Sequence, residues 1–300
     1  MRRNRTIIQA LIGATILAGG LTALTPAAQA STPVGCSEGE LVAAINLANA
    51  SGGDTLALAP GCIYRMTSAH GGGASDALPV ITSRVELLGP ATITRASGSR
   101  FRIAEVSATG NFTLTTEVKL TNGSANGDGG AILNHGAVTL TNSRLSGNTA
   151  TGNGGGLANA DTPSGTAPAA TFTTGPTFTG DAVSNNTAGS RGGGIYNGLN
   201  DTLTTTGVSG TNTQLRITGN TAGNALSLSG GKGGGIAAVN STKTTLTETT
   251  VTTNHALGLF GTAGGVYRLN GIMVTTNSPI TANTPNNCVG SVPAVPNCTG

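Results

Sequence analysis

Polar residues that could do chemistry recur at one register of the sequence. Short glycine runs lead into an aliphatic residue, and the second position after the aliphatic is Asn134, Asn159 and Asn197 in three of these segments. This alignment predicts a polar groove that binds a sugar or a cation. Its side chains would be those of Asn134, His135, Asn159, Asp161, Asn197 and Asp201. The sequence favours an alternative, in which the asparagines bond backbone groups at turns and the acids are solvated in loops.

Other candidates for chemistry are sparse. The acids of the repeat region stand singly, without an Asp-x-Asp or adjacent pair, whereas calcium takes several clustered carboxylate oxygens. His70, His135 and His255 stand apart, and no Gly-x-Ser-x-Gly motif surrounds a serine. No histidine lies near a cysteine, and the cysteine spacings do not match zinc motifs. The sequence therefore predicts no catalytic residue, no metal site and no cofactor.

Two repeated motifs indicate the elements that position these residues. The first is the glycine run with its aliphatic residue, as in GGGL at 154–157 and GGGI at 192–195 and 233–236. The second reads aliphatic, Ser or Thr, any residue, Asn, and it ends at Asn148, Asn186, Asn220, Asn254 and Asn277. Subtraction of these numbers gives separations of 38, 34, 34 and 23 residues. Self-similarity at such periods is typical of solenoids.

The repeats predict an all-β fold, a right-handed parallel β-helix from about Asp54 to Asn283. Short runs rich in Val, Ile and Thr alternate apolar and polar residues, which indicates strands, and glycines suit the corners between them. Each strand would pair in parallel with its counterpart one turn on, ~4.8 Å away. Five aliphatic residues should point inward in one column: Ile132, Leu157, Ile195, Ile236 and Val266. Four asparagines should occupy one corner of the stack: Asn148, Asn186, Asn220 and Asn254.

The N-terminal segment is typical of a secretory signal peptide. Residues 1–30 contain a basic start, an apolar stretch from Ile7 to Leu24 and the cleavage site Ala28-Gln29-Ala30. Its removal takes away three of the 15 basic residues, which leaves 15 − 3 = 12 against 12 acidic ones. The neutral mature chain has no Lys/Arg run, so we expect an extracellular protein, released or associated with the cell surface. It should bind no nucleic acid and make no stable membrane insertion.

Both ends of the mature chain carry features expected of caps. Gly39 to Ser51 predicts a helix with an apolar face of Leu41, Ala44, Ile45 and Ala48, because an exposed solenoid end needs covering. Four cysteines in an exported chain imply disulfides with three possible connectivities, of which local pairing, Cys36–Cys62 and Cys288–Cys298, needs the least chain reorganisation. The expected divisions are a signal peptide (1–30), an N-terminal cap with its helix (31–53), the β-helix (54–283) and a C-terminal disulfide cap (284–300).

These segments resemble a known family. The helix between two cysteines, then FRIAEVSATGNFTLTTEVKLTNG and the GGAI, GGGL and GGGI repeats with Asn-Thr-Ala, are similar to secreted bacterial right-handed β-helix proteins of the pectate-lyase-like superfamily. They resemble in particular the members with polymorphic-outer-membrane-protein-type GGAI repeats. The resemblance covers most of the mature chain and implies the fold. It implies little about activity, since members range from polysaccharide lyases and glycosidases to adhesins.

Three functions remain open. The sequence favours a structural or binding protein, adhesin-like or glycan-interacting, whose partner is an extracellular polysaccharide or a cell surface. The alternative is a carbohydrate-active enzyme, a polysaccharide lyase or glycosidase, for which calcium is the possible cofactor and whose support is the resemblance alone. The third is an ice- or crystal-surface binder, which a flat threonine ladder would support. Thr-x-Thr pairs occur at Thr139/Thr141, Thr171/Thr173, Thr177/Thr179, Thr202/Thr204 and Thr245/Thr247.

Overall fold

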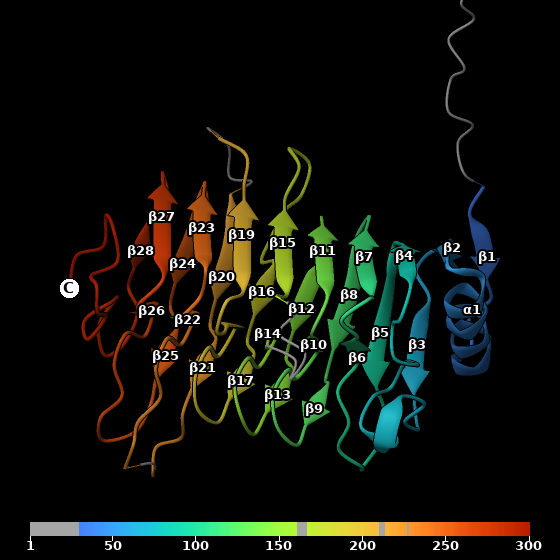
Figure 1. Cartoon of the computed structure of the whole chain (residues 1–300), viewed down its shortest axis with the longest axis horizontal. Helices are drawn as coiled ribbons and strands as arrows, with labels where there is room; N and C mark the ends of the chain where they lie inside the picture. The colour runs from blue at the N-terminus through green and yellow to red at the C-terminus, as the bar shows by residue number, and fades with distance from the viewer. Residues whose placement is uncertain (1–29, 161–166, 210–213, 227) are drawn as a thin grey trace, which may run out of the picture. The chain divides into compact units, whose positions relative to one another are not determined.

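Glycine corners and short alternating runs coil this chain into a stack of turns. The computed structural model describes residues 30–160, 167–209, 214–226 and 228–300. Within these residues the strands form four sheets, and neighbouring strands of every sheet are parallel (Figure 1). Each full turn contributes one strand to each sheet. The chain is therefore a parallel β-helix, and the predicted all-β solenoid is confirmed at this level.

The two larger sheets hold the longer strands. The nine-stranded sheet contains, in spatial order, β1 (Thr32–Val34), β2 (Gly53–Leu58), β4 (Arg84–Leu88), β7 (Asn111–Thr115), β11 (Ala137–Thr141), β15 (Ala169–Thr173), β19 (Thr202–Thr206), β23 (Lys243–Thr247) and β27 (Ile272–Thr276). The eight-stranded sheet contains β28 (Ile280–Thr281), β24 (Thr249–Thr252), β20 (Leu215–Thr218), β16 (Val183–Ser184), β12 (Arg144–Ser146), β8 (Val118–Thr121), β5 (Ala91–Arg95) and β3 (Ile63–Met66).

The two smaller sheets carry the glycine motif and the corner after the second motif. The six-stranded sheet contains β26 (Val266–Leu269), β22 (Ile236–Val239), β18 (Ile195–Asn197), β14 (Leu157–Asn159), β10 (Ile132–Asn134) and β6 (Ala104–Val106). The five-stranded sheet contains β25 (His255–Ala256), β21 (Thr221–Ala222), β17 (Thr187–Ala188), β13 (Thr149–Ala150) and β9 (Ser124–Ala125). A short 3-10 helix, η1 (Gly72–Ala74), lies in the N-terminal turns.

The register between turns keeps equivalent residues directly above one another. β7, β11, β15, β19, β23 and β27 pair over five residues at each step, although the connections between them differ in length. The predicted inner column is confirmed, because five aliphatic residues pair in register and have no exposed surface: Ile132, Leu157, Ile195, Ile236 and Val266. A narrow interior of this kind needs small aliphatic residues and few aromatic ones, which agrees with the low aromatic content of the sequence.

The predicted helix is present as α1 (Glu38–Ser51), one residue longer than expected at its start. Ser37 caps it by accepting a hydrogen bond from the backbone N–H of Glu40, and Gly52 ends it with φ 87°. Leu41, Ile45 and Ala48 are buried in the same core as the strands, while Ala44 is partly buried against that core. Among the described residues, no helix has the length and apolar character needed to cross a bilayer.

Two features of the N-terminal region differ from the sequence-based expectation. β1 precedes the helix and pairs in parallel with β2, so the nine-stranded sheet already begins at Thr32. The alternation of apolar and polar residues in Phe101-Arg102-Ile103 predicts a strand, but these residues lie before strand β6. Arg102 makes only an isolated bridge to Asp76, and its guanidinium bonds the buried Asp76 carboxylate at 2.6 Å. This buried ion pair fixes the local path of the chain, which apolar alternation alone could not indicate.

The disulfide prediction is confirmed at both ends. Cys36 is bonded to Cys62, across a sequence separation of 26 residues that includes α1 and β2. Cys288 is bonded to Cys298 near the C-terminus. Closing a loop of about 25 residues stabilises a protein by roughly 3 kcal/mol in the chain-entropy model. The predicted signal peptide lies almost wholly outside the described residues, which begin at Ala30.

Glu38 anchors the start of α1 to the segment after β3. Its carboxylate accepts hydrogen bonds from the backbone N–H and hydroxyl groups of Thr67 and Ser68, and from His70 Nε2 at 2.8 Å. Burial alone raises the pKa of Glu38, but the hydrogen bonds from Thr67, His70 and Ser68 outweigh it and lower the pKa to about 2. The ionised carboxylate is therefore the form that the fold stabilises.

Replacement of this carboxylate should weaken the fold in a pH-dependent way. Because the folded-state pKa is depressed, the contribution is complete above the unfolded value, 4.5, and is lost as pH falls toward 2. We expect Glu38→Gln to reduce the free energy of unfolding at pH 7 by on the order of 2 kcal/mol, and the difference from wild type to vanish near pH 2. Urea unfolding at both pH values measures this. Glu117→Gln, at an exposed carboxylate, is the matched control.

Candidate functional site

The first asparagine column consists of Asn134, Asn159 and Asn197, at the ends of β10, β14 and β18. The three side chains stack in register and have no exposed surface. Asn134 Nδ2 donates to Asn159 Oδ1 at 2.9 Å, and Asn159 Nδ2 donates to Asn197 Oδ1 at 2.9 Å. The same amides bond the backbone carbonyls of Ala169 and Thr202. These asparagines therefore join successive turns inside the protein and present no atom to a ligand in solvent.

The remaining members of the predicted groove do not form one surface with them. Asp201 is also fully buried, and its Oδ2 accepts the backbone N–H of Gly198 at 3.0 Å. His135 is half-buried and its Nδ1 lies 2.6 Å from the carbonyl oxygen of Ala160. Asp161 lies outside the described residues. The polar register that the sequence shows is real, but the structure places four of its six residues in the interior.

The second asparagine column consists of Asn148, Asn186, Asn220, Asn254 and Asn283. At each step Oδ1 of one asparagine accepts two bonds from the preceding member, one from its backbone N–H and one from its Nδ2, at 2.9–3.0 Å. Each Nδ2 also donates to a carbonyl of the turn before, as Asn220 does to Val183 at 3.0 Å. The predicted equivalence of the first four residues is confirmed.

The fifth member of this column differs from the residue that the sequence motif predicted. The sequence motif ending at Asn277 suggested a repeat of 23 residues, but Asn277 follows β27 and bonds Glu248. The column continues instead through Asn283, which is 29 residues after Asn254. Ile280-Thr-Ala-Asn283 fits the same motif, and Ile280 pairs with Val251 in register. The buried aliphatic residue before the asparagine decides which copy of the motif is used.

An array of threonines lies on the outer face of strands β7 to β27 of the nine-stranded sheet. Two adjacent columns of it hold one threonine per strand over successive turns. The first column is Thr113, Thr139, Thr171, Thr204 and Thr245, and the second is Thr115, Thr141, Thr173, Thr206, Thr247 and Thr276. These eleven residues are here called the threonine array. All of them are half-buried or exposed, whereas the residues between them on each strand are buried.

The sequence indicated only part of this array. Its Thr-x-Thr pairs at 139/141, 171/173 and 245/247 lie in the two columns. In β19 the matching pair is Thr204 and Thr206, because Leu203 lies above Ala170 in the core and sets the register. Thr177 and Thr179 lie outside the strands. The signal that identifies a member of the array is a Thr-x-Thr pair whose middle residue is buried. Recognising that burial requires the alignment of each turn with the next.

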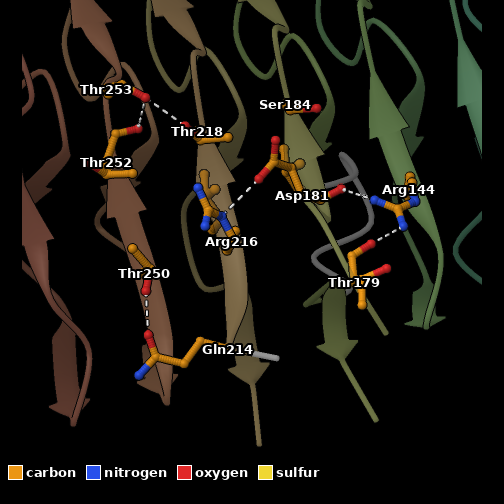
Figure 2. Close-up of polar contacts among 12 residues, drawn as sticks. Arg144, Thr179, Asp181, Ser184, Gln214, Arg216, Thr218, Thr250, Thr252 and Thr253 are labelled. Atoms are coloured by element: carbon orange, nitrogen blue, oxygen red, sulfur yellow. Dashed lines mark hydrogen bonds and ion pairs between the residues drawn. The ribbon is translucent and has the colours of Figure 1, made fainter. Parts of the chain in front are cut away.

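The outer face of the eight-stranded sheet has one column of hydroxyl residues and, beside it, charged residues, and in this it differs from the threonine array. Arg216 Nε lies 2.9 Å from Asp181 Oδ1, and Arg144 donates to the backbone oxygens of Asp181 and Thr179 (Figure 2). Beside them is a hollow of about 370 Å³ lined by Lys119, Thr121, Arg144, Ser146, Gly180, Asp181 and Ser184. Asp181 is the one carboxylate of this lining and pairs with Arg216. The hollow can accept a small polar group.

Metal chemistry has no evident centre in the described part of the chain. Within it, no three His, Cys, Asp or Glu side chains lie close enough together to hold a metal ion.

Comparison with known proteins adds no family: no protein-family model matches the chain, and searches of curated proteins and of solved structures found no match. The fold thus defines the chain as a parallel β-helix protein, and its surfaces carry the argument about function.

The second asparagine column should contribute measurably to stability. We expect Asn220→Ala to reduce the free energy of unfolding by roughly 1–3 kcal/mol, because it removes the Oδ1 that accepts the backbone N–H and Nδ2 of Asn186 and the Nδ2 that donates to Asn254 and to the carbonyl of Val183. Thermal or urea unfolding measures the change. Asn46→Ala, on the exposed side of α1, is the matched control and should be close to neutral. Equal stability of the two variants would contradict a structural role for the column.

Proposed function

We propose that the chain is an exported binding protein that acts outside the cell and has no catalytic role. In this proposal it is a right-handed β-helix of the pectate-lyase-like superfamily, in which α1 caps the N-terminal end of the core. The GGAI and GGGI repeats support the superfamily, and the burial of Leu41 and Ile45 against the strands supports the cap. Two disulfides are compatible with an oxidising compartment, as is the apolar leader with its Ala-x-Ala site.

The threonine array is the observation that carries the binding role. On this face threonine repeats at fixed spacing in two directions, along each strand and from turn to turn. A single threonine contact contributes little, but many weak contacts made together on a rigid scaffold add up, since each further contact is made at high effective concentration. The partner that suits such a face is uncharged, polar and extended, such as an ordered polysaccharide or another ordered solid.

The charged hollow on the eight-stranded sheet does not favour the enzyme alternative. β-Elimination from a uronate requires a base within hydrogen-bond reach of the α-proton and a cation on the carboxylate. In the hollow, Asp181 is paired with Arg216, and Arg144 is bound to two backbone oxygens and lies 4.5 Å from the ring centroid of Phe178. Asp181, Arg216 and Arg144 therefore bond one another or the backbone, which suits a structural role for the cluster.

Adsorption to solids tests the proposed function. The purified chain from Ser31 onward is mixed with microcrystalline cellulose, chitin, polycrystalline ice and, as an anionic comparison, polygalacturonate gel. We expect depletion from solution by at least one of the uncharged solids, and loss of that depletion in Thr171→Lys. Thr252→Lys, at a half-buried position on the outer face of the eight-stranded sheet, is the matched control and should adsorb like wild type.

Two results would contradict the proposal. One is adsorption that Thr171→Lys and Thr252→Lys reduce equally, because the array would then have no special part in it. The other is release of unsaturated uronate products from polygalacturonate, with or without millimolar calcium. If that product signal vanished in Asp181→Asn, the charged hollow would be the active site of an enzyme.

A further inference from the structure

The threonine array is regular because the interior fixes it. Between β7 and β23 each step of the nine-stranded sheet pairs five residues without a bulge. Neighbouring threonines of one column are therefore about 4.8 Å apart, and the two columns are about 6.6 Å apart along the strand direction. In Figure 1 these strands lie side by side and point the same way. The face is thus a two-dimensional lattice of hydroxyl and methyl groups with a fixed repeat.

The hydroxyl groups of the central threonines are available to a ligand. Among the described residues, none donates to or accepts from the side-chain hydroxyls of Thr139, Thr171, Thr204 and Thr245, or those of their column neighbours Thr141, Thr173, Thr206 and Thr247. Each hydroxyl offers one donor and two acceptor positions. β-Branching restricts χ1, so these groups lose little conformational freedom when a ligand immobilises them.

The array has neither charges nor aromatic rings within its borders. Glu86 lies beyond Thr113 at one end and is bonded to Thr115 at 3.2 Å, while Val274 follows Thr245 at the other end. Lys243 lies in the neighbouring column, next to Thr202. The aromatic side chains of these strands, Phe112 and Phe172, point into the core. The face therefore offers only neutral hydrogen-bonding and methyl groups.

We propose that the threonine array binds the surface of crystalline ice, an inference that rests on the proposed binding role of this face. Ice presents uncharged donors and acceptors at a fixed two-dimensional repeat, which is the chemistry and the order that the array itself has. A rigid solid loses no conformational entropy on contact, whereas a flexible chain must be ordered to match a fixed lattice. Methyl groups between the hydroxyls exclude liquid water from the contact and add an apolar contribution.

Other partners fit this face less well. Sugar rings stack on aromatic side chains, and the array has none. Nucleic acid and anionic lipid need a basic surface, which a neutral array does not provide. A second copy would bury two polar hydroxyl faces with little of the apolar core that stable interfaces have. The face of the eight-stranded sheet serves as an internal comparison, because it has a single column of hydroxyl residues, which runs through Thr121, Ser146, Ser184, Thr218 and Thr252. The column beside it carries the charged residues Lys119, Arg144 and Arg216 in place of a second row of threonines.

The test measures thermal hysteresis, the gap between the melting and freezing points of a seed ice crystal, together with partition of the protein into a slowly growing ice front. The proteins are wild type, Thr171→Lys, Thr139→Lys and the control Thr252→Lys. Lysine is tolerated on this sheet, since Lys243 occupies the outer face of β23. Circular dichroism melts establish that all four proteins are folded. Two array positions are substituted separately, so that the test still holds if one of the two variants fails to fold.

We expect wild type and Thr252→Lys to show hysteresis, faceted ice crystals and enrichment in the ice, and both array variants to lose all three. The inference is overturned if wild type shows no hysteresis and stays in the liquid. If in that case the array variants lose adsorption to cellulose or chitin, the array binds an ordered polysaccharide and the proposed function stands. If no solid is bound, both proposals are overturned. Concentration-dependent dimerisation abolished by Thr171→Lys, without ice binding, would show that the face is an interface between copies.

Discussion

The hydrogen bonds between asparagine side chains in successive turns are the interaction on which this structure depends. A buried amide that lacks a partner costs about 1–3 kcal/mol, so each asparagine of the second column is stable only if the next one lies directly above it. One Oδ1 accepts both the N–H and the Nδ2 of its neighbour, and that neighbour's amide also bonds a carbonyl of the turn before. A slip of one residue in any turn would break three bonds at once. The columns therefore specify register as well as contributing stability.

Register in the interior determines order on the outside. Because side chains alternate between the two faces of a strand, a sheet that keeps Phe112, Val138, Ala170 and Leu203 in one inner column must keep its outward residues aligned as well. The connecting loops absorb the differences in length between turns. A protein with few aromatic residues and a narrow core can in this way hold a precise surface lattice. The outer face of the eight-stranded sheet keeps the same kind of register, but it has one column of Ser and Thr beside charged residues, so two adjacent threonine columns are a property of the nine-stranded sheet.

Much of the fold could be predicted from the sequence, because the repeated motifs can be aligned with one another without a structure. The inner column, the first four members of the second asparagine column, the helix and both disulfides were predictable from spacing and residue type. The candidate site was harder. Asn134, Asn159 and Asn197 were aligned correctly, and the sequence favoured their bonding to backbone groups, as the contacts with Ala169 and Thr202 show. The same interpretation placed the acids in solvent, whereas Asp201 is buried, because alignment alone does not tell the inside of a turn from the outside at a corner. Asn283 was missed because a nearby copy of the motif ends at Asn277, and only the buried partner of Ile280 distinguishes them. The Arg102–Asp76 pair is a long-range contact that no local pattern reveals.

The most direct test of this account is a distance across the threonine array. Spin labels are placed at Thr115→Cys and Thr276→Cys, since the four native cysteines are disulfide-bonded and leave no free thiol in the described residues. Five turns separate these positions, so pulsed dipolar spectroscopy should give one narrow distance distribution at about 24 Å, with a shorter one at about 19 Å for the four-turn pair Thr113→Cys and Thr245→Cys. A broad distribution, or a pair of distances that does not differ by one turn, would contradict the register on which both the asparagine columns and the array rest.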